Sequence, residues 1–328
     1  MAKHNVQVSA FSTRKLLEGS WEVWHLHWPE SLTNKTHSSD IILTLVKFWI
    51  QLKLARYKKT TIFWTAHNLR PHERDHPLFD RIFWRIFLSN VDGIICMSKL
   101  GRQQLCIEHS RARSIPMFLI PHGHYRGAYP DVVSRDDARN ALQVRPNEFV
   151  ITFLGQIRRY KGIVPLIRCF TQAQVTNTEL IIAGSPVDKA LLLEIKEAAA
   201  NNPYVRMFPD FVDPNDIQKF LRATDLVVLP YNEILNSGSA ILALSFDRPI
   251  LVPALGALAE LREIVGPEWV RLYEGELSPE IIRNAIDWAK GRSLGSNARA
   301  PLDGLNWDRI AQLTIRAFSL HSAAAMTT

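Results

Sequence analysis

FVITFLGQIRRYKG, at residues 149–162, is the stretch that decides the fold. It begins as a continuous apolar run, ends that run at Gly155, and continues into a basic loop and a helical pattern. A strand buried on both faces of a parallel sheet has this composition, and a glycine after it lets the backbone approach a ligand closely. The loop cations Arg158, Arg159 and Lys161 can donate charge-assisted hydrogen bonds to a diphosphate, with a solvated basic turn as the structural alternative.

Similar apolar runs recur on both sides of this stretch, separated by longer helical patterns. They are VQVSAF (6–11), WEVWHLHW (21–28), TTIFWTAH (60–67), DGIICMS (92–98), MFLIPHG (117–123), TELIIAG (178–184), VRMFPD (205–210), DLVVLP (225–230) and RPILVP (248–253). Strands that alternate with helices in this way predict an α/β protein with parallel sheets. Ligands of such sheets bind beyond the carboxyl ends of the strands.

The segment at residues 122–144 is rich in Gly, Pro and charge and separates two sets of runs. It predicts two Rossmann-like domains that face each other across a cleft, with a linker around residues 124–132. We expect an N-terminal domain over residues 1–127 and a C-terminal domain over residues 128–299. Residues 300–328 would form a helix that packs back on the N-terminal domain, followed by a tail.

Composition limits the class of protein. The chain has 328 residues, of which 47% are hydrophobic and 22% charged, which suits folded domains with well-formed cores. Cys96, Cys106 and Cys169 lack the spacing of a zinc site, so we expect buried reduced thiols and a cytoplasmic protein. The net charge of +7 allows an anionic partner such as nucleic acid, a phospholipid surface or a nucleotide diphosphate.

Two helical segments of the first half combine apolar, aromatic and basic residues. They are SSDIILTLVKFWIQLKLARYKK (38–59) and PLFDRIFWRIFLSN (77–90). Helices of this kind can lie in a lipid headgroup layer, and ordinary helices that cover a sheet are the alternative. We expect peripheral contact with an anionic membrane surface, on the cytoplasmic face of the inner membrane.

A second signal lies in LPYNEILNSGSAILALSFDRPILVP, at residues 229–253. A strand leads into small residues directly before an apolar helix: Asn236, Ser237, Gly238 and Ser239. Such a helix start exposes backbone N–H groups and the positive end of the helix dipole, which suits a phosphate. By itself the pattern is only an N-cap.

The order of these motifs resembles the donor domain of glycosyltransferase family 4. The resemblance covers most of the chain and implies a GT-B fold, a nucleotide-sugar donor held by the C-terminal domain, an acceptor held by the N-terminal domain, and no obligatory metal or other cofactor. It implies that the donor is bound by Gly155, Arg158, Lys161, Gly184, Ser185, Glu233, Ser237, Gly238 and Ser239.

One departure from the family pattern concerns two glutamates that family members usually carry eight positions apart. In this sequence Ile234 and Leu242 occupy those places, and Glu233 lies next to the first. The chain therefore resembles a divergent branch found in bacterial exopolysaccharide clusters, and the donor and stereochemical outcome stay open.

Polar residues follow two strands of the first half, in HWPE (27–30) and WTAHNLRPHE (64–73). At the predicted cleft they would supply a general base or ligands for sugar hydroxyls, and satisfied loop histidines are the alternative. The catalytic candidates are His67, Glu73 and Glu30, and the acceptor-binding candidates are His27, Asn68, Arg70 and His72. In the resembling family a histidine of this domain approaches the donor sugar, and His67 matches it best.

The start of the chain departs from the GT-B pattern as well. Such N-terminal domains open with a strand, a glycine loop and a helix, whereas MAKHNVQVSAF (1–11) resembles the end of that helix followed by the second strand. We expect the first strand and most of the first helix to be missing, which would weaken or abolish activity.

The predicted reaction is transfer of a hexose or uronic acid from a UDP- or GDP-sugar to a lipid-linked oligosaccharide during surface-polysaccharide synthesis. An inverting transfer would need a base, whereas a retaining one would not. The alternatives are a catalytically inactive GT-B partner subunit, a nucleotide-sugar epimerase and a nucleic-acid-binding protein. The aromatic residues lie in strands and apolar helices, which speaks against binding of nucleic acid.

Overall fold

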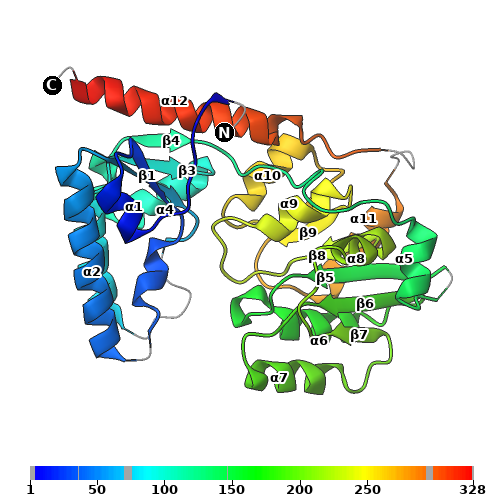
Figure 1. Cartoon of the computed structure of the whole chain (residues 1–328). Helices are drawn as coiled ribbons and strands as arrows, with labels where there is room; N and C mark the ends of the chain where they lie inside the picture. The colour runs from blue at the N-terminus through cyan, green and yellow to red at the C-terminus, as the bar shows by residue number, and fades with distance from the viewer. Residues whose placement is uncertain (1–3, 36, 70–75, 146, 293–297, 327–328) are drawn as a thin grey trace. The chain divides into compact units, whose positions relative to one another are not determined.

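The computed structural model describes residues 4–35, 37–69, 76–145, 147–292 and 298–326 of the chain, with side chains up to residue 320. The chain divides into two compact units (Figure 1). Unit 1 comprises Met1–His122 and Leu305–Thr328, and unit 2 comprises Gly123–Gly304. Each unit contains its own parallel sheet, so the predicted α/β class is confirmed.

The sheet of unit 1 has the strand order β1-β2-β3-β4, and every neighbouring pair is parallel. Its strands are β1 (Val23–Leu26), β2 (Thr61–Ala66), β3 (Gly93–Cys96) and β4 (Met117–Leu119). The helices of the unit are α1 (Thr13–Glu18), η2 (Pro29–Thr33), α2 (Ser38–Tyr57), α3 (Pro77–Leu88), α4 (Lys99–Glu108), η3 (Ser110–Ser114) and α12 (Trp307–Met326).

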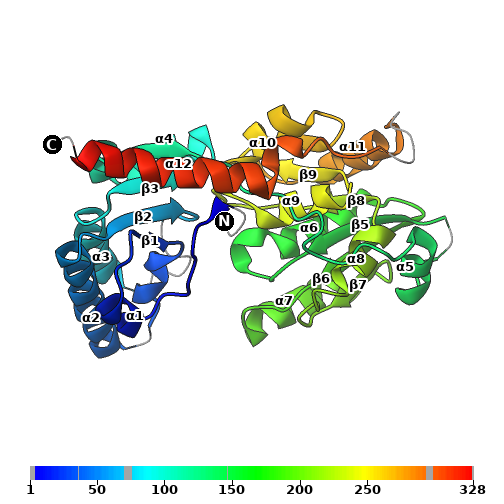
Figure 2. The same ribbon diagram turned by 45° about the horizontal axis from the view of Figure 1, so that its top comes forward.

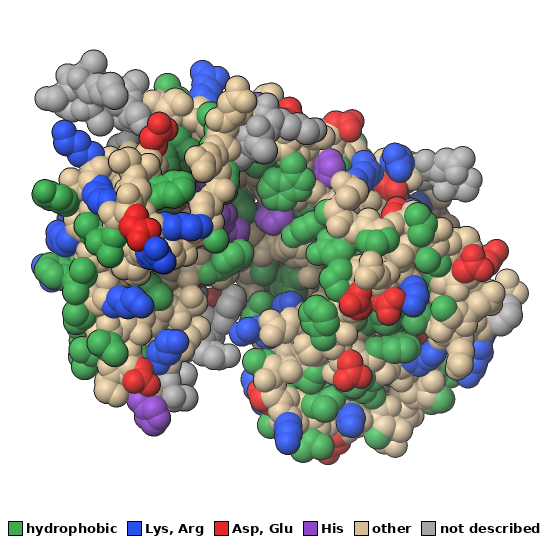
Figure 3. Space-filling view, viewed as in Figure 1, with side chains coloured by type: hydrophobic (Ala, Val, Ile, Leu, Met, Phe, Trp, Pro, Cys, Tyr) green, Lys and Arg blue, Asp and Glu red, His purple; other side chains and the backbone are tan. Residues whose placement is uncertain are grey.

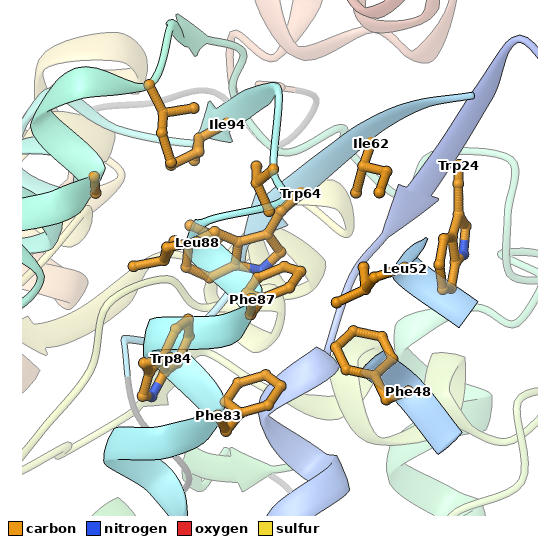
Figure 4. Packing of buried hydrophobic residues seen from close by; sticks show 14 of the residues in the cluster. Trp24, Phe48, Leu52, Ile62, Trp64, Phe83, Trp84, Phe87, Leu88 and Ile94 are labelled. Atoms are coloured by element: carbon orange, nitrogen blue, oxygen red, sulfur yellow. The ribbon is translucent and has the colours of Figure 1, made fainter. Parts of the chain in front are cut away.

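Alternation along β2 divides the core of unit 1 between the two faces of its sheet. Ile62 and Trp64 belong to one cluster, while Phe63 belongs to another, because successive side chains of a strand point to opposite faces. On the first face, Trp64 packs against aromatic residues of α3 and near the buried face of α2 (Figure 4). This cluster explains why the two apolar helices of the first half cover a sheet.

The last helix completes the opposite face of the same sheet. Ile310 and Ala317 of α12 pack with Phe63, Ile95 and Ile120, and Leu313 and Phe318 lie against them. α12 therefore lies along β3, as Figure 2 shows. Helix α12, which follows unit 2 in the sequence, thus contributes side chains to the hydrophobic core of unit 1.

The sheet of unit 2 has the order β10-β9-β8-β5-β6-β7 and is parallel throughout its described pairs. Its strands are β5 (Phe149–Leu154), β6 (Thr178–Ala183), β7 (Val205–Phe208), β8 (Leu226–Val228), β9 (Ile250–Pro253) and β10 (Val270–Tyr273). The helices are α5 (Arg135–Ala141), η4 (Arg159–Lys161), α6 (Ile163–Ala173), α7 (Lys189–Ala199), α8 (Ile217–Ala223), α9 (Gly238–Ser245), α10 (Leu258–Val265) and α11 (Pro279–Lys290); η5 (Asp303–Leu305) follows at the junction with unit 1.

Two details of the predicted strands were wrong. Residues 6–11 form no strand; instead Phe11 stacks on Trp24 with ring centroids 4.3 Å apart, and Ser12 caps α1. Conversely, the structure contains a strand that was not predicted, β10. It lies at the edge of its sheet, and its exposed Arg271 interrupts the apolar run. The three cysteines are unpaired as predicted, with Cys96 and Cys169 buried and Cys106 half-buried.

Candidate functional site

The strand order of unit 2 identifies where a ligand can bind. β5 and β8 are neighbours, and the chain proceeds from β5 to β6 on one side and from β8 to β9 on the other. At such a switch point the loops that follow the two strands separate, and a crevice opens beyond their carboxyl ends. The basic loop follows β5, and the small-residue turn follows β8, so both sequence signals lie at this point.

Two glycines end the paired strands β5 and β6. Gly155 has φ of +137° and Gly184 has φ of +140°, a backbone region that favours glycine. A Cβ atom on Gly184 would clash with the carbonyl oxygen of Gly155. A Cβ atom on Gly155 would lie 3.0 Å from Ser239 Oγ and 3.6 Å from Lys161 Nζ. The strand end, the basic loop and the start of α9 therefore converge on Gly155.

Lys161 presents a partly buried cation at this convergence. Burial, and then the nearby Arg158, lower the pKa of its ammonium group to about 8. Its Nζ lies 5.9 Å from the centre of the Phe153 ring, and none of the described carboxylates forms an ion pair with it. A desolvated ammonium group without a carboxylate partner is suited to bind an anionic ligand.

The start of α9 is organised by hydroxyl groups. Ser237 is the N-cap, and its Oγ accepts a hydrogen bond from Ala240 N at 3.1 Å. The Tyr231 hydroxyl lies 3.0 Å from Ser237 Oγ and is also hydrogen-bonded to Ser239. Burial raises the pKa of Tyr231 to about 12, so the phenol keeps its proton. The first-turn amides of Gly238 and Ser239 remain oriented toward the helix N-terminus, where the dipole favours an anion.

The basic loop and the turn before α9 are also joined through their backbones. Asn232 N donates to Tyr160 O at 2.8 Å, and a Cβ atom on Gly162 would clash with Pro230 O. These contacts fix the two loops against each other. Tyr231 was missed by the sequence analysis, although its position directly after an apolar strand was a signal that could have found it.

The other predicted donor residues lie around this group. Ser185 is half-buried, and its carbonyl accepts from Ile157 N at 2.9 Å, which joins the loops after β5 and β6. Arg158 is half-buried, and its Nε donates to Gln156 Oε1 at 3.1 Å. Glu233 is exposed in the segment between β8 and α9.

In unit 1 the carboxyl ends of β1 and β2 bring histidines together. His27 Nδ1 lies 2.9 Å from His67 Nε2, and His25 Nε2 lies 2.7 Å from Thr65 Oγ1. Burial, followed by the neighbouring His27, lowers the pKa of both His25 and His67 to about 3. These two imidazoles are therefore neutral at neutral pH, and the His27–His67 contact joins one donor to one acceptor.

Glu30 and Asn68 form a second polar pair in unit 1. Asn68 Nδ2 donates to Glu30 Oε1 at 3.0 Å, and Glu30 Oε2 is buried without a hydrogen bond. Burial raises the pKa of Glu30 to about 7. The remaining candidates of this group, Arg70, His72 and Glu73, lie outside the described residues.

Comparison with known proteins identifies the family. The model of the group 1 glycosyl transferases matches residues 134–243. The chain is also 30% identical to the GDP-mannose:glycolipid 4-beta-D-mannosyltransferase of Xanthomonas campestris pv. campestris over 315 residues, which cover 95% of this chain and 84% of that protein. The chain belongs to the group 1 glycosyltransferases. The resemblance predicted from the order of motifs is thereby confirmed.

Solved structures support the fold of this glycosyltransferase. The sucrose-phosphate synthase of Thermosynechococcus elongatus has a TM-score of 0.71 at 20% identity, covering 95% of this chain and 76% of its own. The Anabaena protein HepE in complex with UDP-glucose has a TM-score of 0.63 at 16% identity, covering 87% and 77%. WaaG, described as a glycosyltransferase involved in lipopolysaccharide biosynthesis, has a TM-score of 0.60 at 13% identity, covering 86% and 85%. The predicted GT-B fold is confirmed.

The glycosyltransferase takes its sugar from a nucleotide-sugar donor. The cluster around Gly155 offers what such a donor requires at its diphosphate, namely a cation and helix N-terminal amides. Across the part of the chain that the structure describes, no group of three His, Cys, Asp or Glu side chains is arranged to hold a metal ion.

Proposed function

We propose that this glycosyltransferase transfers a mannosyl group from GDP-mannose to a hydroxyl group of a lipid-linked saccharide during synthesis of a surface polysaccharide. The observation that carries the proposal is the 30% identity, over 95% of the chain, to a mannosyltransferase named for GDP-mannose and a glycolipid. The residues that follow β5, β6 and β8 support the proposal as well, because Lys161 and Ser239 converge on Gly155 at the carboxyl ends of these strands.

Lys161 and the α9 N-terminus would stabilise the departing GDP. As the bond between the sugar and the phosphate breaks, negative charge grows on the diphosphate, and a preorganised cation with backbone amides lowers the energy of that state. Arg158 would add a second cation, since it lies close enough to lower the pKa of Lys161. In this mechanism the protein neutralises the leaving group without an obligatory metal ion.

The relative's name also bears on stereochemistry. The sugar of GDP-mannose is α-linked to phosphate, so a β-mannoside product requires inversion and a base for the acceptor hydroxyl. Glu30 is only 4% exposed and holds Asn68, whereas His67 is half-exposed and neutral at neutral pH. We assign the base to His67 because it is the more accessible of the two groups; its pKa of about 3 must rise in the complex with both substrates for the imidazole to accept the proton of the acceptor hydroxyl as the new bond to the sugar forms.

A test of the donor uses the melting temperature of the protein with GDP, UDP and ADP, because a ligand that binds only the folded state raises it. GDP should give the largest shift, and Lys161→Ala should remove most of it. Lys196→Ala, an exposed lysine on α7, is the matched control. A larger shift with UDP than with GDP would refute the choice of donor, and GDP binding without transfer to any lipid-linked saccharide would indicate an inactive subunit.

The outer face of α2 supports the proposal of a lipid-linked acceptor. Its inward residues are buried, yet large apolar residues on the other side are 45–70% exposed: Ile42, Leu43, Val46, Trp49 and Ile50. Lys47 and Lys53 lie among them, and Lys53 Nζ is 6.0 Å from the Trp49 ring. Figure 3 shows apolar and basic side chains next to each other over the region where α2 lies in Figure 1.

Such a face matches the boundary between lipid headgroups and acyl chains. Fully burying one large aliphatic side chain contributes roughly 1.5–3 kcal/mol, and each lysine near an anionic surface adds about 1 kcal/mol. Among the described residues, no helix is both long enough and apolar enough to cross a bilayer. We propose that α2 lies on the membrane that carries the acceptor.

The membrane proposal predicts a change in vesicle binding. Leu43→Glu should reduce cosedimentation with vesicles of phosphatidylglycerol and phosphatidylcholine, because it places a charge in the apolar face. Leu193→Glu, at a leucine of α7 that is 67% exposed, is the control and should bind as the wild type does. Equal binding by the wild type and Leu43→Glu would contradict the assignment of this surface.

A further inference from the structure

Trp28 is a large aromatic side chain left exposed beside the histidines of unit 1. It follows β1 closely and is 58% exposed, whereas Trp24 in the same segment is 8% exposed. Trp24 packs in the core, so the two indoles of one short segment have different surroundings. Trp28 contributes little to the core, so packing does not explain why a tryptophan occupies this position.

The indole of Trp28 is held in a fixed orientation. Its ring stacks on that of His67, with centroids 4.6 Å apart and an interplanar angle of 24°. His67 is in turn joined to His27 by the 2.9 Å contact between ring nitrogens. The backbone of Trp28 is fixed as well, because its carbonyl accepts from Ser31 Oγ at 2.7 Å and from Ser31 N at 3.2 Å.

This arrangement matches the chemistry of a pyranose ring. One face of a pyranose presents mainly C–H groups, which pack against a flat aromatic face, while its rim carries hydroxyl groups that need hydrogen-bonding partners. The neighbours of Trp28 supply such partners, because the imidazole of His67 stacks against it and the ring of His27 lies 5.5 Å away, tilted by 39°. An aromatic ring with only two side-chain torsions also loses little entropy when it binds.

We propose that Trp28 is a stacking platform for the acceptor sugar, placing the apolar face of that sugar beside His67. The inference rests on the proposed function, because it takes the sugar next to His67 to be the acceptor. Stacking would hold the acceptor sugar and orient its attacking hydroxyl toward the imidazole of His67. Trp28 would therefore set the affinity for the acceptor, while the nucleotide site in unit 2 would not depend on it.

The test measures contact and turnover separately. Octyl glycosides of glucose, mannose and glucuronic acid serve as acceptor probes below their micelle-forming concentrations. Saturation-transfer NMR reports which pyranose protons touch the protein, steady-state kinetics with GDP-mannose gives the acceptor KM, and calorimetry gives the affinity for GDP. The variants are Trp28→Ala and Trp28→Phe, and the control is Phe211→Ala, at a phenylalanine of unit 2 that is 75% exposed.

We expect Trp28→Ala to weaken the saturation signal of the pyranose C–H protons and to raise the acceptor KM by about tenfold or more, the loss of one stacked ring. GDP affinity should be unchanged, and Trp28→Phe should recover part of the loss. Equal pyranose signals in the wild type and Trp28→Ala, or no pyranose signal in the wild type, overturn the platform. If the wild type transfers no mannose while the signal still depends on Trp28, the proposed reaction fails and the platform stands.

Discussion

Glu30 and the neighbouring histidines depart from their ordinary pKa values in opposite directions. Burial raises the pKa of Glu30 from 4.5 to about 7, so the folded protein holds this proton more tightly than the unfolded chain. Its contribution to the free energy of unfolding is fully present below pH 4.5 and is lost as the pH rises to about 7. His25 and His67 stabilise the fold above pH 6.5, and that contribution is lost as the pH falls toward 3.

Glu30→Gln should therefore stabilise the protein on the alkaline side only. Glutamine keeps an oxygen for Asn68 but never ionises, so the variant should gain up to about 3 kcal/mol at about pH 8 and little at about pH 5. Chemical denaturation at the two pH values measures the difference. A gain of the same size at both would show that the charge of Glu30 is not the cause.

His67 allows a prediction about activity at the same scale. If His67 is the base, His67→Ala should lower kcat/KM by about 10²–10⁴-fold. Because its pKa is lowered to about 3, the wild-type profile should show no inflection from His67 near 6.5. His37→Gln, at an exposed histidine before α2, is the control. An inflection near 6.5 that vanishes only in the His67 variant would mean that this imidazole ionises normally.

The turns that end β5 and β6 depend on glycine for two separable reasons, backbone conformation and space. Gly184 and Gly275 both have positive φ, at +140° and +71°, but only at Gly184 would a Cβ atom clash, with Gly155 O. Gly184→Ala should lower both stability and GDP affinity, whereas Gly275→Ala should lower stability by about 1 kcal/mol and leave GDP affinity unchanged. Calorimetric titration with GDP distinguishes the two variants. An unaltered GDP affinity in Gly184→Ala would show that this turn is not part of the nucleotide site.

Elements with strong local patterns were predictable from the sequence. The runs around β5 and β6 are apolar over most of their length, and the Ser-Gly-Ser start of α9 is a typical helix cap. β10 was not predicted because a strand at the edge of a sheet needs no continuous apolar run. Residues 6–11 were wrongly predicted as a strand. A short run with β-branched residues also occurs in irregular segments, and here the segment is held by the stacking of Phe11 on Trp24.

The partners within the candidate site were harder to predict than its residues. Gly155, Lys161 and Ser239 were named from local motifs, and their convergence follows from the strand order. By contrast, the contact of His27 with His67 joins residues that are distant in the sequence and depends on the register of β1 and β2. Burial, which sets the pKa of Glu30, is likewise a property of the packed chain.

At the scale of the molecule, the protein has two cores that should respond separately. Ile310 of α12 is 7% exposed in the cluster with Phe63, so Ile310→Ala should cost about 2–4 kcal/mol and lower only the unfolding transition of unit 1. GDP should raise only the transition of unit 2. Leu320→Ala, at a position of the same helix that is 52% exposed, is the control in scanning calorimetry. One transition that moves as a whole in every case would show that the units unfold together.

The position of α12 bears on how the protein is made. A ribosome releases the chain from its N-terminus, so β1 to β4 emerge before unit 2, but the helix that covers Phe63 and Ile95 is translated only after it. All of unit 2 is made in between, which takes roughly tens of seconds at cellular rates of synthesis. The nascent first unit must keep one apolar sheet face uncovered for that time, so the second unit is the first to finish folding, and a chaperone that binds exposed apolar strands would act on the first.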